Sequence, residues 1–217
     1  MSKSTGLVFE AETSRGTEPS SATLEDKSRN KNHGTMTNVT YTQLDSGLWV
    51  QDYDGTAYID CGADGSLNFI SSSFSIAAWV YPSTIADQYL ISRGLYSVDG
   101  YTIFLDNAGV IYLTTQQGGG QRFAATAAGI LVANVWQFIA CVRDNTVGYI
   151  YKNGIDVTDS TQSLSNPVTS NRNYYIGQKD DGTQRFSGMI WGHRIVTYPF
   201  TQGQIEAIVA DEYRWLL

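Results

Sequence analysis

The sequence predicts an all-β protein in which antiparallel strands pack as a two-sheet sandwich. Short apolar runs recur along the chain, most of them end near Gly, Asn or Asp, and no helical period separates them. The chain also has 14 Tyr and 5 Trp, and aromatic residues favour strands. Short Asn-containing links join 101–106 to 110–115 and 137–144 to 147–154, which indicates two hairpins. This pattern is typical of an antiparallel sandwich.

Each predicted strand is an apolar or alternating run bounded by turn residues. The run at 73–82 is mostly apolar on both faces, as expected for a strand that is covered on both sides. Further strands are expected at 7–11, 47–53, 57–61, 88–93, 173–178 and 186–198. The end of the chain differs, because Thr201 and Gln204 form a capping box before a helical spacing of apolar residues. We expect a short helix at about 205–213, within a single domain over 1–217.

Composition excludes several classes of function. The net charge is −7 and no basic run exists, so nucleic-acid binding through phosphate contacts is not expected. No segment approaches the roughly 18 apolar residues of a membrane helix, and no signal peptide is visible at the N-terminus. The sequence contains no CxxC motif and no His/Cys cluster, so a zinc site is not expected. Cys61 and Cys141 either form one disulfide or remain two buried thiols, and the sequence leaves both open.

Several short motifs follow one another along most of the chain. They are "DKSRNKNHG" at 26–34, "YDGTAYID" at 53–60, "FSIAAWVYP" at 74–82, "WQFIACVRDNTVGYIYKNG" at 136–154 and an "IG…FSG" segment from 176 onward. Their order resembles that of laminin-G-like domains of the concanavalin A-like lectin/glucanase superfamily. Arg29 and His193 depart from the family pattern. The resemblance implies a jelly-roll of two curved antiparallel sheets, although such a fold does not fix the function.

The sequence does not indicate an enzyme. The related glucanases carry an E-x-D-x-x-E strand, which places alternate carboxylates on one face for acid and nucleophile roles. Here Glu10 and Glu12 are the one pair of Glu residues at this spacing, and the third carboxylate is missing. His33 and His193 do not accompany a nucleophile elbow, so a Ser/His/Asp triad is not expected either.

The polar loop at 26–34 is a candidate calcium site. Its oxygen-bearing side chains alternate along the chain and include Asp26 and Asn30, and Ca²⁺ takes such oxygen ligands. The resemblance implies calcium at the rim of the sandwich, and a second carboxylate such as Glu12 would have to come from the neighbouring strand. The alternative is a loop that Asp26 and Asn30 tie by hydrogen bonds to backbone N–H groups.

The middle third of the chain is a candidate carbohydrate site. Sugar binding needs flat aromatic surfaces beside amides and hydroxyls that hydrogen-bond ring OH groups. We expect the ligand contacts among Tyr96, Tyr101, Tyr112, Gln117 and Arg122. The alternative is that these aromatic residues only pack across neighbouring strands.

These observations predict a non-catalytic, lectin-like sandwich for surface adhesion or carbohydrate recognition, with a glycan or cell-surface partner. The alternative is a virion structural protein, such as a capsid decoration, spike or tail component, that contacts other virion proteins or forms a homo-oligomer. The expected location is accordingly an extracellular surface or a virion. Trp215, Leu216 and Leu217 would form the docking patch of the structural alternative, unless they pack back on the sandwich.

Overall fold

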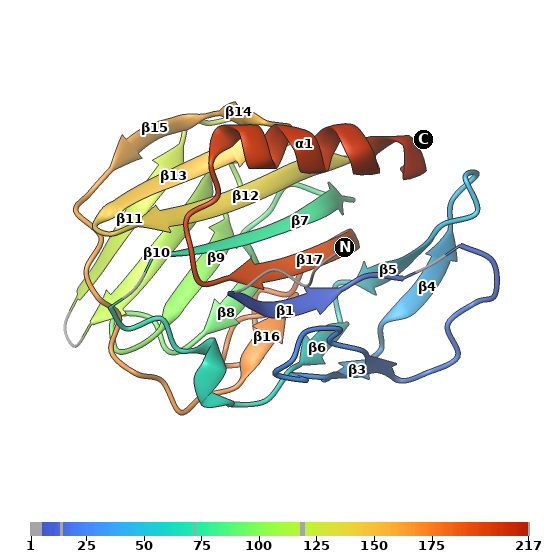
Figure 1. Ribbon diagram of the computed structural model, residues 1–217, viewed down its shortest axis with the longest axis horizontal. Helices are drawn as coiled ribbons and strands as arrows, with labels where there is room; N and C mark the ends of the chain where they lie inside the picture. Colours follow the sequence, from blue (N-terminus) through green and yellow to red (C-terminus); the bar gives the residue numbers. More distant parts are fainter. Residues whose placement is uncertain (1–5, 14, 72, 118–119, 217) are drawn as a thin grey trace.

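The computed structural model describes residues 6–13, 15–71, 73–117 and 120–216, except for the side chain of Gln117. Two antiparallel sheets pack face to face, as predicted, and one α-helix lies on the outside (Figure 1). The architecture confirms the all-β jelly-roll class. In the described part of the chain, no helix is long and apolar enough to cross a membrane.

The first sheet has eight strands in the order β14-β13-β12-β7-β17-β5-β4, and β1 also pairs with β17. Its long central strands β7 and β17 are paired along most of their lengths, with one irregularity between Trp191 and Arg194. The strands are β1 (Leu7–Ala11), β4 (Thr40–Gln43), β5 (Trp49–Asp54), β7 (Phe74–Pro82), β12 (Gln137–Asp144), β13 (Val147–Lys152), β14 (Ile155–Asp156) and β17 (Ser187–Val196).

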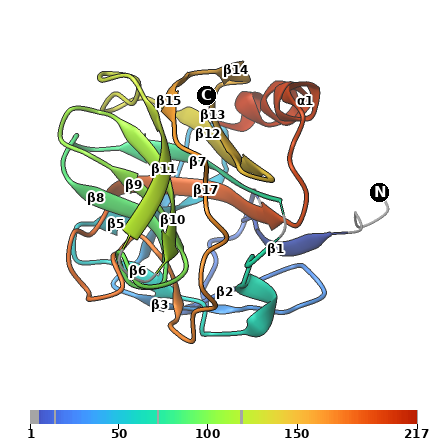
Figure 2. The ribbon, with the colours of Figure 1, turned by 90° about the vertical axis from the view of Figure 1, so that its left-hand side faces the viewer.

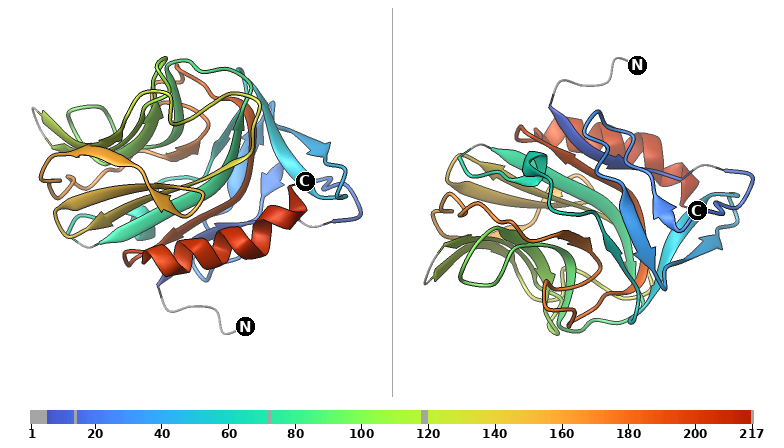
Figure 3. Two further views of the ribbon diagram at one scale, coloured as in Figure 1. Left: turned by 90° about the horizontal axis from the view of Figure 1, so that it is seen from above. Right: turned by 90° about the horizontal axis from the view of Figure 1, so that it is seen from below.

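The second sheet has nine strands in the order β15-β11-β10-β9-β8-β16-β6-β3-β2. The two predicted hairpins are confirmed, one in each sheet: β9 pairs with β10 here, and β12 pairs with β13 in the first sheet. The strands are β2 (Thr23–Leu24), β3 (Gly34–Thr37), β6 (Tyr58–Asp60), β8 (Gln88–Arg93), β9 (Tyr101–Leu105), β10 (Ile111–Gln117), β11 (Gly120–Thr126), β15 (Thr158–Thr161) and β16 (Tyr174–Ile176). Seen from above and below, the two sheets curve around a shared interior (Figure 3).

Helix α1 (Gln202–Glu212) covers the outer face of the eight-stranded sheet. It begins three residues before the predicted start, because Thr201 caps it and the Gln204 side chain completes the capping box. A second apolar cluster lies beneath the helix and includes Trp79, Phe138 and Ile205. Figure 2 shows α1 and strands β8–β11 on opposite sides of the molecule, so no helix of the described residues lies over the outer face of the nine-stranded sheet.

A buried ion pair fastens α1 to the sheet. Trp79 Nε1 donates to Glu212 Oε2 at 2.8 Å, and Arg194 Nη2 donates to Glu212 Oε1 at 2.5 Å. Burial raises the pKa of Glu212, while Arg194 and the Trp79 hydrogen bond oppose the rise. Charge-assisted hydrogen bonds of this kind are the stronger class, so this contact fixes the end of the helix.

The C-terminal residues pack back on the sandwich. Leu216 is 6% exposed and belongs to the apolar cluster beneath α1, so its prediction as a docking residue is wrong. Trp215 is half-buried, with the guanidinium carbons of Arg15 and Arg214 at 4.9 and 4.6 Å from its ring centroid. Leu217 lies outside the described residues. The two cysteines, Cys61 and Cys141, are buried free thiols, which settles the choice that the sequence left open.

His193 on β17 is a buried, neutral histidine. Its Nε2 lies 2.8 Å from the Tyr174 hydroxyl, and its ring packs 5.2 Å from that of Phe9. Burial, helped by the neighbouring Arg194 charge, lowers the pKa of His193 from 6.5 to about 3. Folding therefore holds this imidazole in its uncharged form.

The lowered pKa of His193 predicts an acid-dependent loss of stability. Below pH 6.5 the His193 imidazole binds a proton in the unfolded chain, whereas in the folded chain it binds one only near pH 3. The contribution of this residue is therefore complete above pH 6.5 and is lost as the pH falls, by up to ~1.4 kcal/mol per pH unit. Urea unfolding at several pH values measures this slope. His193→Gln should flatten it. Equal slopes for the two proteins would contradict the prediction.

Candidate functional site

The outer face of the nine-stranded sheet carries a row of four aromatic rings. Tyr89, Phe104 and Tyr112 are direct cross-strand partners on β8, β9 and β10. Their ring centroids are 5.0 Å apart between Tyr89 and Phe104 and 6.0 Å apart between Phe104 and Tyr112. Phe123 on β11 extends the row, with its ring centroid 5.7 Å from that of Tyr112. Such spacings are typical of favourable aromatic pairs.

This aromatic row forms part of an open groove of about 340 Å³. The volume is at the lower end of the range for small-molecule sites. Its aromatic lining consists of Tyr89, Phe104, Tyr112 and Tyr96, the last from the loop between β8 and β9. Its polar lining consists of Thr102, Thr114, Gln121, Gln184 and Asp106. Apolar ring faces therefore lie beside hydroxyl and amide groups that donate and accept hydrogen bonds.

A chain of hydrogen bonds runs along the floor of the groove. The Ser97 backbone N–H donates to Gln116 Oε1 at 2.7 Å, which fixes the orientation of the buried Gln116 amide. Gln116 Nε2 in turn donates to Thr114 Oγ1 at 2.9 Å, and Thr114 Oγ1 lies 2.6 Å from Thr102 Oγ1. The loop that carries Tyr96 is thus tied directly to the strands beneath it.

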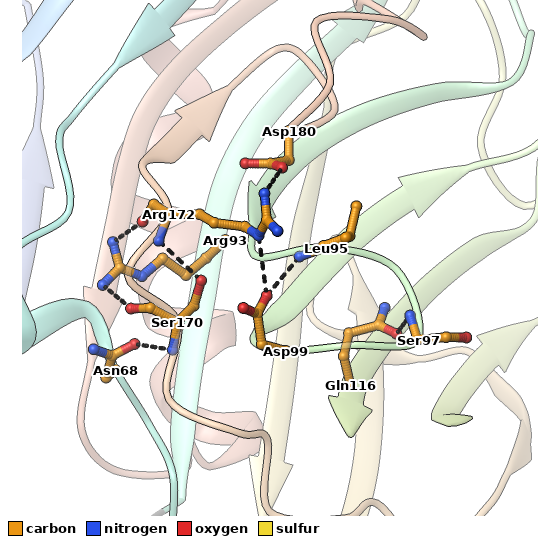
Figure 4. Close-up of polar contacts among 9 residues, drawn as sticks. All are labelled: Asn68, Arg93, Leu95, Ser97, Asp99, Gln116, Ser170, Arg172 and Asp180. Carbon is orange, nitrogen blue, oxygen red and sulfur yellow. Dashed lines mark hydrogen bonds and ion pairs between the residues drawn. The ribbon is translucent and has the colours of Figure 1, made fainter. Parts of the chain in front are cut away.

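An ion-pair network holds the same loop from its other side (Figure 4). Asp99 Oδ1 accepts from the Leu95 backbone N–H at 2.7 Å and lies 3.6 Å from Arg172 Nε. Arg172 Nη1 also pairs with Asp180 Oδ2 at 2.9 Å. The loop must also turn sharply, and at Gly100 (φ +73°) a Cβ would lie 1.7 Å from the Arg93 carbonyl oxygen. The position of Tyr96 is therefore set by contacts on both sides of its loop.

Both tyrosines in the row with shifted pKa values remain neutral hydrogen-bond donors near pH 7. Burial, together with the nearby Asp181 carboxylate and Tyr96, raises the pKa of Tyr89 to about 12. Burial and the Asp106 carboxylate raise the pKa of Tyr112, whose hydroxyl lies 3.3 Å from Asp106 Oδ2. The neutral Tyr112 phenol donates its one O–H to Asp106 Oδ2, which a phenolate could not do.

The structure brings together two of the five predicted ligand residues, Tyr96 and Tyr112. The prediction of Tyr101 as a ligand contact is wrong, because its side chain is 1% exposed and its hydroxyl donates to the Leu67 carbonyl in the core. Arg122 is wrong as a groove residue, because side chains alternate along β11 and its neighbour Gln121 occupies the groove side. The side chain of Gln117 lies outside the described part of the chain.

Sequence reasoning missed several lining residues, although a signal for one of them existed. Phe104 shares a face with the predicted Tyr112, which the hairpin link between 101–106 and 110–115 could have revealed through its register. Gln184 could not have been found in this way, because it comes from the loop between β16 and β17.

The polar loop at 26–34 is held by the Asp26 carboxylate. Asp26 is fully buried, and its Oδ1 accepts from the backbone N–H groups of Glu10 at 3.0 Å and Ser28 at 2.8 Å. Its Oδ2 accepts from the Ser28 hydroxyl and the Asn32 backbone N–H, both at 2.8 Å. These donors occupy the directions in which a carboxylate accepts hydrogen bonds. Asp26 therefore ties the loop in the manner of an Asx turn.

The other predicted calcium ligands point elsewhere. Asn30 Nδ2 donates to the Val8 carbonyl at 3.1 Å. Glu12 Oε1 lies 3.4 Å from Arg194 Nη2, in the ion-pair cluster beneath α1. Among the described residues, no group of three or more His, Cys, Asp or Glu side chains could hold a metal ion. Calcium binding at this loop stays a prediction.

The geometry of Asp26 predicts that its charge stabilises the fold. Asp26→Asn replaces one acceptor oxygen by a donor that would face N–H and O–H groups, so we expect the free energy of unfolding to fall by about 2–4 kcal/mol. Asp45→Asn, at an exposed site, is the matched control. Thermal unfolding of both variants in calcium chloride and in EDTA also tests the ion. An unchanged stability of Asp26→Asn would contradict the loop-tying role, and an equal melting temperature in both buffers would contradict calcium binding.

Comparison with known proteins agrees with this architecture. The chain is 22% identical over 200 residues to the adhesion G-protein coupled receptor V1 of Danio rerio. This match covers 88% of the chain but only 3% of that receptor. The structure is similar to the binding domain of Paraclostridial Mosquitocidal Protein 1, with a TM-score of 0.73 and 15% identity. That similarity covers 96% of this chain and 52% of the other, so the chain spans about half of that binding domain.

A second similar structure matches along nearly its whole length. It is domain 4 of AbnA, an extracellular arabinanase from Geobacillus stearothermophilus, solved in complex with arabinotriose. The TM-score is 0.63 at 18% identity, and the match covers 92% of this chain and 99% of that domain. At these identities the likeness concerns the fold. The profile of the concanavalin A-like lectin/glucanases superfamily matches residues 53–206, most of the chain, and the chain belongs to that superfamily.

Proposed function

We propose that this domain recognises carbohydrate through the groove on the outer face of the nine-stranded sheet. The observation that carries the proposal is the joint lining of aromatic rings and of hydroxyl and amide groups. Sugar rings have apolar C–H faces that pack on aromatic side chains, and their hydroxyls need both donors and acceptors. The similar arabinanase domain was solved with a bound arabino-oligosaccharide, which supports this ligand class.

The groove is suited to binding rather than to hydrolysis. Glycoside hydrolysis needs a pair of carboxyl groups across the scissile bond. Among the described lining residues, Asp106 is the single carboxylate, and its Oδ1 accepts from the Ala108 and Val110 backbone N–H groups at 2.9 Å. We therefore expect recognition without turnover, consistent with an adhesion or targeting role at a cell surface.

The alternative of a structural block in a virion relied on an apolar docking patch at the C-terminus. Leu216 packs into the sandwich and Trp215 is covered in part by Arg15 and Arg214, so much of that patch is used within the domain. In contrast, the described part of the chain places no helix over the outer face of the sheet that carries the open groove (Figure 2). Carbohydrate recognition is therefore the function that the geometry supports best.

The direct test is a glycan array that holds neutral and acidic oligosaccharides, followed by titration calorimetry with the strongest ligand. Tyr96→Ala should weaken binding about 3- to 10-fold, because one exposed aromatic contact is lost. Tyr213→Ala is the matched control: Tyr213 is 46% exposed, close to the 52% of Tyr96, but it lies at the end of α1 on the other sheet. A blank array, or equal losses for the two variants, would count against the groove as a carbohydrate site.

A further inference from the structure

We infer that the groove selects uncharged glycans and discriminates against glycans that carry carboxylate or sulfate groups. This inference rests on the proposed function and adds the chemical class of the ligand. It follows from the charges that surround the aromatic row.

The groove has one fixed negative charge and no positive charge in its described lining. Asp106 is the single charged lining residue, and the other lining side chains are Tyr, Phe, Thr and Gln. Asp106 is held at the start of the tight link between β9 and β10 by the Ala108 and Val110 backbone N–H groups. Its Oδ2 faces the Tyr112 hydroxyl at 3.3 Å, so the charge lies beside the aromatic row.

Cations near the lining residues in the chain are engaged elsewhere, and the nearest to Tyr96, Arg93, is fully buried and donates to the Arg172 and Ser170 carbonyls. Lys179 Nζ pairs with Asp181 Oδ2 at 2.8 Å, and Asp181 acts electrostatically on Tyr89 at the edge of the groove. Arg185 donates to Gln178 Oε1 and to the Thr56 carbonyl, both at 3.1 Å. Arg122 lies on the other face of β11 from Gln121.

The loop that carries Tyr96 adds no free cation either. The Arg172 guanidinium is shared between Asp99 and Asp180, at 3.6 and 2.9 Å. Arg93 also acts electrostatically with Asp99, so the cluster has two guanidinium groups for two carboxylates and adds no net positive charge. The net charge of the chain is −7, which makes the long-range field negative.

An acidic sugar would therefore bring its charge toward Asp106 without a counter-ion. Two like charges that are several Å apart in a partly desolvated groove repel each other by an amount that reduces affinity tenfold or more. A neutral sugar meets no such repulsion. Its hydroxyls can instead donate to Asp106 Oδ2 and to the threonine and glutamine oxygens, and a carboxylate acceptor makes the stronger type of hydrogen bond.

Matched pairs of glycans test this inference. The probes are cellotetraose with its C6-carboxylated form, and lactose with 3′-sialyllactose, together with the strongest neutral ligand from the array and its C6-carboxylated form. We expect each neutral member that binds to bind at least about tenfold more tightly than its acidic partner at low salt. Raising the salt concentration should narrow this ratio, because salt screens the repulsion.

The variant Asp106→Asn tests whether this carboxylate is the group that discriminates against acidic glycans. Its Oδ1 can still accept from Ala108 and Val110, so the link between the strands should persist, and circular dichroism can check this. The neutral-to-acidic ratio should fall at least threefold in Asp106→Asn. It should not change in Asp211→Asn, whose carboxylate is exposed on α1.

The failures of the two proposals differ. If no glycan binds, the proposed function itself fails. If acidic glycans bind as tightly as neutral ones, or if Asp106→Asn leaves the ratio unchanged, carbohydrate recognition survives and the inference about charge is overturned.

Discussion

The alternation of side chains along β8–β11 is the constraint on which the groove depends. Tyr101, Ile103 and Leu105 of β9 point into the core, while Thr102 and Phe104 point outward. A slip of one residue would exchange these two sets, burying polar groups and emptying the core. The register is fixed where β9 turns into β10, since Asp106 accepts the backbone N–H groups of the turn. Asp106 therefore both supplies the negative charge of the groove and fixes the register that aligns its aromatic rings.

One outer face of the sandwich is covered by a helix and the other is not, and one buried ion pair holds that helix in place. Glu212 would be costly to bury alone, but Arg194 and Trp79 satisfy both of its oxygens. This contact fastens α1 over the aromatic residues of the eight-stranded sheet. Among the described residues no helix covers the nine-stranded sheet, and three rings of its outer aromatic row line an open groove. An uncovered row beside polar side chains is what distinguishes a binding face from a second packing interface.

Local sequence signals could predict the class of fold but only part of the site. The capping box at Thr201, the two hairpins and the alternating runs depend on neighbouring residues, and the structure confirms them. Tyr101 failed as a ligand contact because its face depends on the parity of β9, which only the register sets. Leu216 failed because its burial depends on α1 folding back over a distant sheet. The choice between a disulfide and two thiols likewise depends on which strands become neighbours, which spacing alone does not determine.

Near the loop of Tyr96, the buried Arg93 guanidinium is held by backbone carbonyls and not by a direct ion pair with a described carboxylate. Arg93 is fully buried and donates to the backbone carbonyls of Arg172 at 2.6 Å, and of Asp64 and Ser170 at 3.1 Å. Burial lowers the pKa of Arg93, but carbonyl dipoles from two irregular segments keep its guanidinium hydrogen-bonded. These segments form no sheet ladder at this point, and Arg93 supplies side-chain donors to their carbonyls. The loop of Tyr96 is bound to this assembly through Arg172 and Asp99, so the shape of the groove does not depend on a ligand. If the groove binds glycans as we propose, binding would order few side chains and more of the contact energy would be expressed as affinity.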